Sequence, residues 1–230
     1  MNGIQSQLLA DIEKHVDKDY LIFFEKINPH VKALGVRVPI LRKIAKEYLK
    51  KYPLKDLLNS LPDDSCFEML FMQCVFIGSI KDVNTALNEI KKFLPSLNGW
   101  CLCDTLCSSL KLCKKHKIEF FSFIEPMFLQ KDEPYTVRFA LVMSNDYFAG
   151  SEFEDKILSY INDIDTTHYY VHMAVAWCLA TFYCKNPEKF TAYLENCPLN
   201  DRTFNKTIQK IKESLIPSVE QKKYLCSLKR

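Results

Sequence analysis

The sequence contains little glycine and no segment that alternates between apolar and polar residues over the length of a strand. Only five of its 230 residues are glycine, whereas eleven are tyrosine and sixteen are phenylalanine. So little glycine argues against the tight turns of a chain built from short strands, and therefore against a turn-rich β protein. Apolar residues instead recur at spacings of three and four almost everywhere, which predicts an all-α fold.

The sequence also has no long hydrophobic run. None approaches the ~18 residues of a membrane-spanning helix. The first twenty residues carry acids and no basic segment followed by an apolar one, so we expect no signal peptide, no membrane partner and a cytoplasmic location. Hydrophobic residues make up 48% of the chain and charged residues 26%, which is ordinary for a globular protein. We expect a monomer.

A Cys-x-x-Cys pair is absent, although the chain has ten cysteines, and the five histidines are scattered. Four cysteines fall along one expected helix, which is a poor arrangement for a tetrahedral metal site: Cys101, Cys103, Cys107 and Cys113. Without a sign of secretion, the thiols are expected to stay reduced and to pack as small hydrophobic side chains. We therefore expect neither a metal nor an organic cofactor.

Positive charge is concentrated near both ends of the chain, although the net charge is only +3. Residues 30–60 hold eight lysines and arginines against two acids, and residues 195–230 hold eight against four. The cluster KLCKKHK at 111–117 adds a third basic segment. Such segments are either solvated lysine faces or an anion-binding surface.

Pairs of helices recur at a nearly constant interval. Pairs that begin near Ser65, Cys101, Pro134, His168 and Asn200 follow one another after about 36, 33, 34 and 32 residues, the kind of period that stacked helical repeats produce. Two such pairs are expected at 65–79 with 81–94 and at 168–184 with 187–196. Helix starts are indicated by capping residues at Asp64-Ser65, Asp165-Thr166-Thr167, Asn186-Pro187 and Asn200.

This period predicts the architecture of the chain. We expect an α-solenoid of HEAT-like antiparallel helix pairs that forms a curved superhelix with a concave groove. The solenoid would be a single domain over residues 1–230, in which four less regular helices up to about Leu61 cap the stack. Function is then expected where the concave face is chemically unusual.

The expected helix that begins near Trp100 separates into two stripes at ~100° per residue. The core stripe consists of Leu102, Leu106, Leu110 and Cys113. The opposite stripe consists of Trp100, Asp104, Cys107 and Lys111. An exposed indole one turn from a carboxylate suits a cationic ligand. The alternative is a boundary tryptophan that covers the helix entrance, with Asp104 paired to a lysine.

Two further residues stand out in apolar helices. Arg138 is the only charge in the segment Pro134–Asn145 and needs a partner, which is either a structural carboxylate or an anion such as a phosphate in the groove. Trp177 lies in a helix that is apolar nearly all round, so periodicity cannot say whether it points into the groove or the core, and taken alone the core is favoured. His172, in the same helix, is expected to be a hydrogen-bonded partner rather than a catalyst.

Taken in order, these residues resemble the AlkD-like DNA alkylation repair family of HEAT-like DNA glycosylases, from about Gly35 to Arg230. Gly35-Val36-Arg37 with Pro39 and Arg42 is similar to the family's N-terminal Gly-Val-Lys/Arg-x-Pro-x-x-Arg element. Trp100 and Asp104 match its Trp-x-x-x-Asp signature, although Cys101 stands where the family often has a second acid. Arg138 matches a groove arginine, and Trp177 matches the second active-site tryptophan.

The resemblance implies hydrolysis of the N-glycosidic bond of N3- or N7-alkylated purines in duplex DNA, without a cofactor. Asp104 would stabilise the oxocarbenium and position the water, while Trp100, Trp177 and Arg138 would bind the substrate. Phosphates would be held by basic residues near both ends: Arg37, Arg42, Lys43, Lys206 and Lys210. Two alternatives are a HEAT-like DNA-binding module without excision activity and a protein–protein scaffold.

Overall fold

A computed structural model describes residues 3–61 and 66–230, and the regular secondary structure of these residues is helical, with no strand. The prediction of an all-α fold is confirmed. The chain divides into two compact units, Met1–His116 and Lys117–Arg230, and each is described by itself. The solenoid, its groove and the single domain over residues 1–230 stay predictions.

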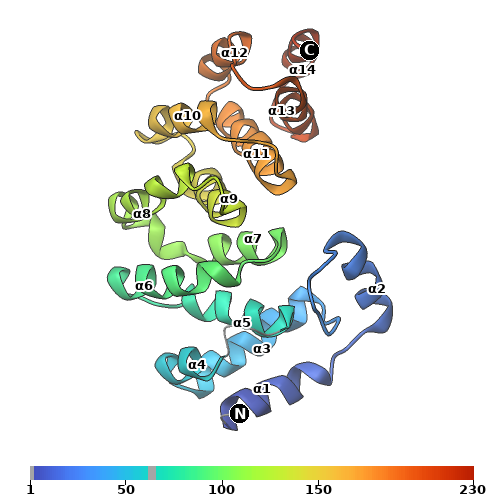
Figure 1. Cartoon of the computed structure of the whole chain (residues 1–230), viewed down its shortest axis with the longest axis vertical. Helices are drawn as coiled ribbons and strands as arrows, with labels where there is room; N and C mark the ends of the chain where they lie inside the picture. Colours follow the sequence, from blue (N-terminus) through green and yellow to red (C-terminus); the bar gives the residue numbers. More distant parts are fainter. Residues whose placement is uncertain (1–2, 62–65) are drawn as a thin grey trace. The chain divides into compact units, whose positions relative to one another are not determined.

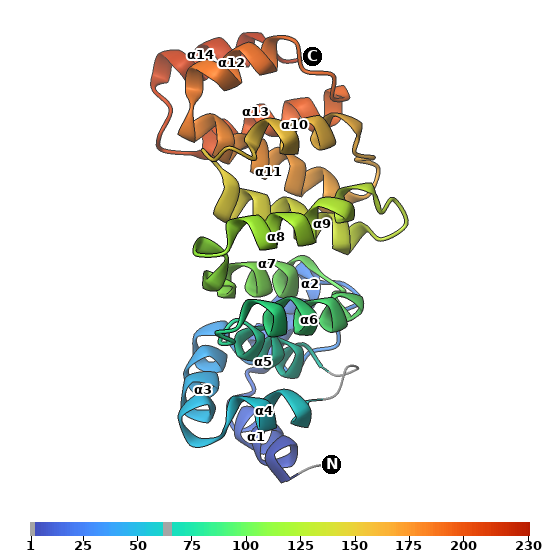
Figure 2. The ribbon, with the colours of Figure 1, turned by 90° about the vertical axis from the view of Figure 1, so that its left-hand side faces the viewer.

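The first unit contains seven α-helices in its described residues, namely α1 (Gly3–Glu13), α2 (Lys18–Ile27), α3 (Val38–Lys51), α4 (Leu54–Ser60), α5 (Phe67–Ile77), α6 (Val83–Phe93) and α7 (Trp100–Ser109). Helix α5 packs between α3 and α7, and it also contacts α4 and α6. In Figure 2, α6 covers α5. This central position explains why nearly every residue of α5 is buried and why its composition is apolar all round.

The second unit repeats this pattern. Its helices are α8 (Lys117–Ile124), α9 (Pro134–Met143), α10 (Glu154–Asp163), α11 (Tyr169–Lys185), α12 (Pro187–Glu195), α13 (Asp201–Glu213) and α14 (Val219–Ser227). Helix α11 packs between α9 and α13, and α12 lies against it (Figure 1). A π-helical turn, Ser144–Phe148, follows α9 and also contacts α11. The second unit is therefore built around α11, as the first is built around α5.

Most helix positions agree with the sequence-based prediction. Four helices precede Leu61, as expected. The side chains of Asn186 and Asn200 cap α12 and α13 by accepting hydrogen bonds from Lys189 N and Thr203 N. The predicted cap at Asp64-Ser65 lies outside the described residues.

The predicted cap at 165–167 is wrong by one residue. The N-cap of α11 is His168, whose Nδ1 accepts a hydrogen bond from Tyr170 N at 3.3 Å. Asp165 instead accepts from Thr167 N at 2.8 Å and closes a short turn just before the helix. An aspartate that bonds the backbone two residues ahead competes with helix capping in this way.

Helix α7 is shorter than predicted, which corrects the two-stripe description. It ends at Ser109, and a 3₁₀ turn, Lys111–Lys114, follows, so Lys111 does not continue the stripe of Trp100 and Asp104. Ser109 lies against the end of α5, because a Cβ atom on Gly78 would stand only 2.4 Å from Ser109 Cβ. Cys107, expected on the outer stripe, is fully buried, because α5 packs against α7.

All ten cysteines lie outside disulfides, and seven of them are buried, which agrees with their expected role as small hydrophobic side chains. No helix within residues 3–61 and 66–230 has the length and apolar character needed to cross a bilayer.

Candidate active site and nucleic-acid interface

Trp100 is the first residue of α7, and Asp104 lies one turn further along the same helix. Both side chains are half-buried. The indole Nε1 of Trp100 donates a hydrogen bond to the carbonyl oxygen of Ile27, the last residue of α2, at 3.3 Å. The tryptophan therefore joins α7 to α2, and its orientation depends on a helix more than 70 residues earlier in the chain.

Glycine precedes the tryptophan because α2 and the loop after it come close to the start of α7. A Cβ atom on Gly99 would stand 3.3 Å from Val31 Cγ2. Gly99 has extended backbone angles and serves as the N-cap of α7, but it offers no side chain to bond the first-turn N–H groups. The beginning of α7 thus combines close packing with an N-cap residue that supplies no side-chain hydrogen bond.

Cys101 lies between these two residues in the sequence, and the charge of Asp104 affects the pKa of its thiol. Burial, and secondly the negative charge of Asp104, raises the pKa of the Cys101 thiol to about 11, while the positive charge of Arg42 opposes this rise. The thiol therefore stays protonated at neutral pH, and it is not a thiolate nucleophile. Arg42, from α3, lies close enough to this part of α7 to act on its electrostatics.

The predicted element Gly35-Val36-Arg37 forms the turn before α3. Gly35 has a φ of 92°, and a Cβ atom there would stand 2.7 Å from Leu21 Cβ, so glycine is required. Arg37 donates two hydrogen bonds to Asp17, at 2.9 and 3.1 Å, and its guanidinium lies 4.8 Å from the ring centroid of Tyr20.

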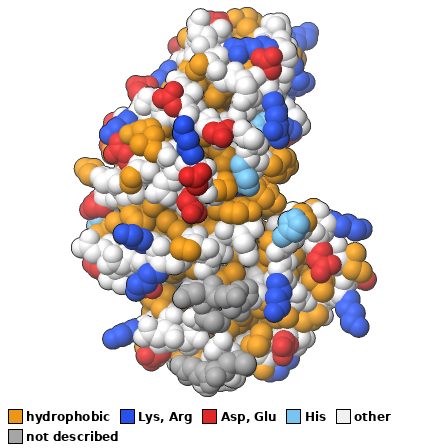
Figure 3. Space-filling view, in the orientation of Figure 1, with side chains coloured by type: hydrophobic (Ala, Val, Ile, Leu, Met, Phe, Trp, Pro, Cys, Tyr) orange, Lys and Arg blue, Asp and Glu red, His pale blue; other side chains and the backbone are white. Residues whose placement is uncertain are grey.

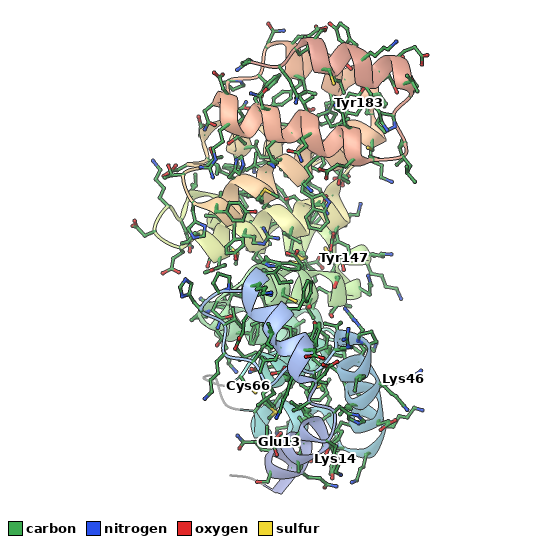
Figure 4. The ribbon with its side chains drawn as sticks, turned by 90° about the vertical axis from the view of Figure 1, so that its right-hand side faces the viewer. Glu13, Lys14, Lys46, Cys66, Tyr147 and Tyr183 are labelled. Carbon is green, nitrogen blue, oxygen red and sulfur yellow. The ribbon has the colours of Figure 1, made fainter. Side chains whose placement is uncertain are left out.

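The three basic residues predicted to bind phosphate in the first unit, Arg37, Arg42 and Lys43, are all exposed. Arg37 is held by its ion pair with Asp17. Arg42 lies over the ring of Phe71, 5.5 Å from its centroid. Lys46, further along α3, projects from the surface in Figure 4. Arg42 is thus the predicted phosphate-binding residue whose charge reaches the start of α7.

Arg138, in the second unit, is only 4% exposed. It donates a hydrogen bond from Nη1 to the carbonyl oxygen of Tyr170 at 2.9 Å, and its guanidinium lies 5.8 Å from the Tyr170 ring centroid. These two contacts join α9 to the first turn of α11. A backbone carbonyl and an aromatic ring are therefore among the partners of this buried guanidinium.

Trp177 is 37% exposed, so it does not belong to the core. It lies on a single partly exposed stripe of α11 whose members are Tyr170, Met173, Trp177, Thr181 and Cys184. The remaining residues between Val171 and Tyr183 are buried, because α9, α12 and α13 cover the other sides of the helix. Although α11 is apolar nearly all round, only the stripe that contains Trp177 is partly exposed to solvent.

Next to this stripe, α13 carries the predicted lysines of the second unit. Lys206 and Lys210 are half-buried, and they bond Gln209 and Glu213 at 2.8 and 2.7 Å. His172 of α11 is buried and lies 3.0 Å from Thr203 Oγ1. It is a hydrogen-bonded partner within the helix packing, as predicted.

The structure brings together Trp100, Asp104 and Arg42 within the first unit. Arg138 and Trp177 both belong to the α9–α11 part of the second unit. Tyr20, whose pKa is raised by burial and, secondly, by Cys101, was not predicted from the sequence. Glu68 was not predicted either, although a lone acid in the apolar run of α5 was a detectable signal.

Other kinds of site find less support. A cavity of about 220 Å³ in the second unit is lined by residues including Pro134, Tyr160 and His168, and none of the predicted site residues lines it. In the part of the chain that the structure describes, no group of three His, Cys, Asp or Glu side chains could hold a metal. Figure 3 shows basic, acidic and hydrophobic side chains interspersed on one face.

A comparison with models of known protein families gives a match to the chain. The model of the family described as DNA alkylation repair enzyme matches residues 4–213, which is nearly all of the 230 residues. The chain therefore belongs to this family of DNA alkylation repair enzymes. No curated protein matches the chain.

Proposed function

We propose that this chain is a DNA glycosylase that hydrolyses the N-glycosidic bond of N3- and N7-alkylated purines in duplex DNA. The observation that carries the proposal is the pair formed by Trp100 and Asp104, half-buried and one turn apart at the start of α7, in a member of the DNA alkylation repair enzyme family.

The proposed chemistry follows from the charge of the substrate. Alkylation at N3 or N7 makes the purine cationic, so it leaves without being protonated by an acid. Departure of the base develops oxocarbenium character on the deoxyribose. The carboxylate of Asp104 stabilises that charge and positions the attacking water. The indole of Trp100 offers a π face to the sugar and to the cationic base.

The second unit contributes substrate binding in this proposal. Trp177 presents its indole on the exposed stripe of α11, and Arg138 orients the first turn of the same helix through Tyr170 O. Phosphates bind to the exposed residues Arg37, Arg42 and Lys43 and to Lys206 and Lys210 of α13. These contacts hold the duplex independently of its sequence.

The decisive experiment measures release of 7-methylguanine from methylated duplex DNA by the wild-type chain and by Asp104→Asn. The substitution preserves shape but removes the charge, so excision is expected to fall by ~10² or more, the scale for loss of one preorganised electrostatic contact. Affinity for undamaged duplex should hold or increase, because one negative charge near phosphates is lost. The melting temperature of both forms serves as the control for folding.

The release assay and the affinity for duplex DNA, measured at several salt concentrations, together distinguish the alternatives. A wild-type chain that binds duplex DNA but releases no base is a DNA-binding module without excision activity. A chain whose DNA affinity does not fall steeply with salt is not a DNA-binding protein of this kind, which leaves the scaffold. Excision by Asp104→Asn at the wild-type rate would end the catalytic assignment.

A further inference from the structure

Glu68, near the start of α5, is a carboxylate that is only 1% exposed. A buried carboxylate is costly unless its oxygens are hydrogen-bonded. Here the carboxylate accepts three backbone N–H groups: Leu34 N at 2.9 Å, Gly35 N at 2.8 Å and Val36 N at 3.1 Å. The adjacent Phe67 N donates to Lys32 O at 2.7 Å. The start of α5 is therefore hydrogen-bonded to the whole turn that leads into α3.

The turn at residues 34–36 also contacts the beginning of α2. The carbonyl oxygen of Gly35 accepts a hydrogen bond from Asp17 N at 3.0 Å. Asp17 is the N-cap of α2, since its Oδ1 accepts from Tyr20 N at 3.0 Å, and its Oδ2 binds Arg37. The close approach of Gly35 to Leu21 leaves little room for α2 to shift against the turn.

Helix α2 then reaches the candidate active site at its other end. Its core residue Phe24 packs on Phe67 with ring centroids 4.6 Å apart, so α2 rests on the same end of α5 that carries Glu68. Its last residue, Ile27, supplies the carbonyl oxygen that accepts from Trp100 Nε1. A continuous path of contacts runs from Glu68 through the turn and α2 to the indole.

We infer that Glu68 is a positioning residue for Trp100: it fixes α2 through the turn at 34–36, and α2 orients the indole at the start of α7. The role of Trp100 in excision rests on the proposed function, but the coupling of Glu68 to the indole does not. Other contacts of α2, such as that between Tyr20 and Arg37, support the helix along its side. Glu68 is the group that holds three donors of the turn at once.

The test is Glu68→Gln in a Trp177→Phe background, where Trp100 is the only tryptophan, since the chain has two. Glutamine keeps the size of the side chain but removes the charge and turns an N–H group toward one of the backbone donors. Trp100 fluorescence is expected to shift to longer wavelength and to become more accessible to acrylamide, and amide protection in α2 should fall. With Trp177 intact, excision should fall about tenfold or more, because small misplacements of a positioning group carry penalties of that size.

The matched control is Glu154→Gln in the second unit. Glu154 is 4% exposed and accepts a hydrogen bond from Gly150 N at 2.8 Å, in another turn where glycine has a positive φ. The same chemical change there should lower stability but leave Trp100 fluorescence unchanged. A purely structural role for Glu68 predicts that both variants lose stability and that neither alters the indole.

A second variant covers the case in which Glu68→Gln does not fold. Asp17→Asn retains the ability to cap α2 but removes the charged partner of Arg37, and it should shift Trp100 fluorescence in the same direction. Unchanged fluorescence in the variants that fold would overturn the inference, as would an equal change in Glu154→Gln. A shift in fluorescence together with no excision by the wild-type chain would support the positioning role and reject the glycosylase.

Discussion

At the residue scale, the chemistry around Asp104 depends on neighbours that restrict which groups can react. The raised pKa of Cys101 keeps its thiol protonated near neutral pH, so the thiol is limited to weak hydrogen bonding. Arg42 brings a positive charge to the same part of α7. Of the side chains in this cluster, Asp104 is the acid suited to stabilise a developing cation.

The left-handed backbone at Gly35 allows a prediction of how an alanine there changes the free energy of unfolding. Gly35→Ala places a Cβ atom at a φ of 92°, 2.7 Å from Leu21 Cβ and 2.8 Å from Asp17 O. Gly150→Ala is the matched control, because its φ is 75° but the nearest atom to its Cβ is 3.8 Å away. Urea unfolding should show a loss of roughly 1–2 kcal/mol for Gly150→Ala from left-handed strain alone.

The loss for Gly35→Ala should be clearly larger, because the steric conflict with α2 adds to the strain. Equal losses in the two variants would mean that α2 moves aside freely. That result would contradict the close packing of α2 against the turn before α3.

At the element scale, the packing of α11 against α13 makes the stability of the folded chain depend on pH. Burial, and secondly the charges of Arg202 and Lys206, lowers the pKa of His172 from its ordinary value of 6.5. The folded state therefore favours the neutral imidazole. The contribution of neutral His172 to the free energy of unfolding is fully present above pH 6.5. It is lost as the pH falls below 6.5 toward the folded-state pKa, because the unfolded chain then binds more protons.

Thermal unfolding at pH 7.5 and 5.5 should show that the wild-type chain loses stability at the lower pH and that His172→Gln loses less. The exposed histidine variant His15→Gln serves as the control and should keep the wild-type difference. NMR titration of His172 at or above pH 6.5 would contradict the prediction.

The elements also differ in how well they could be predicted. Helices α12 and α13 begin where their asparagine caps indicate, because capping is a local interaction between a side chain and the next turn. The end of α7 at Ser109 was missed; Ser109 lies against Gly78 at the end of α5, a contact between helices that apolar spacing does not encode. The orientation of Trp177 was ambiguous for a similar reason, since an apolar helix is exposed only where its neighbours leave it uncovered.

At the scale of the whole molecule, the proposed function assigns DNA contacts to residues of both units, and each contact can be tested by itself. Trp100 and Trp177 are each replaced by a photo-crosslinking aromatic residue and irradiated with duplex DNA that carries one stable lesion analogue. Each position should give attachment that depends on the lesion. The same residue at Ile118, which is 70% exposed, is the control and should give little lesion-specific product.

Attachment at Trp177 that does not depend on the lesion would contradict its assignment to substrate binding. Trp100 and Asp104 would then form the active site without Trp177, and the exposed stripe of α11 would be a separate DNA contact.

The sequence by itself determined the helical class, the positions of most helices and the membership of the repair family. These properties follow from apolar periodicity, local caps and the order of short motifs along the chain. The sequence also identified Trp100 with Asp104 as a pair, because residues four apart on one helix are neighbours whatever surrounds them.

Only the tertiary structure decided what these residues contact. The hydrogen bond from Trp100 to Ile27, the burial of Arg138 beside Tyr170 and the grip of Glu68 on the turn at 34–36 all join segments more than thirty residues apart. Such contacts depend on which helix faces meet across the packing, and local spacing does not encode that pairing. The physical reason is that burial and hydrogen bonding of a side chain are properties of its neighbours in space.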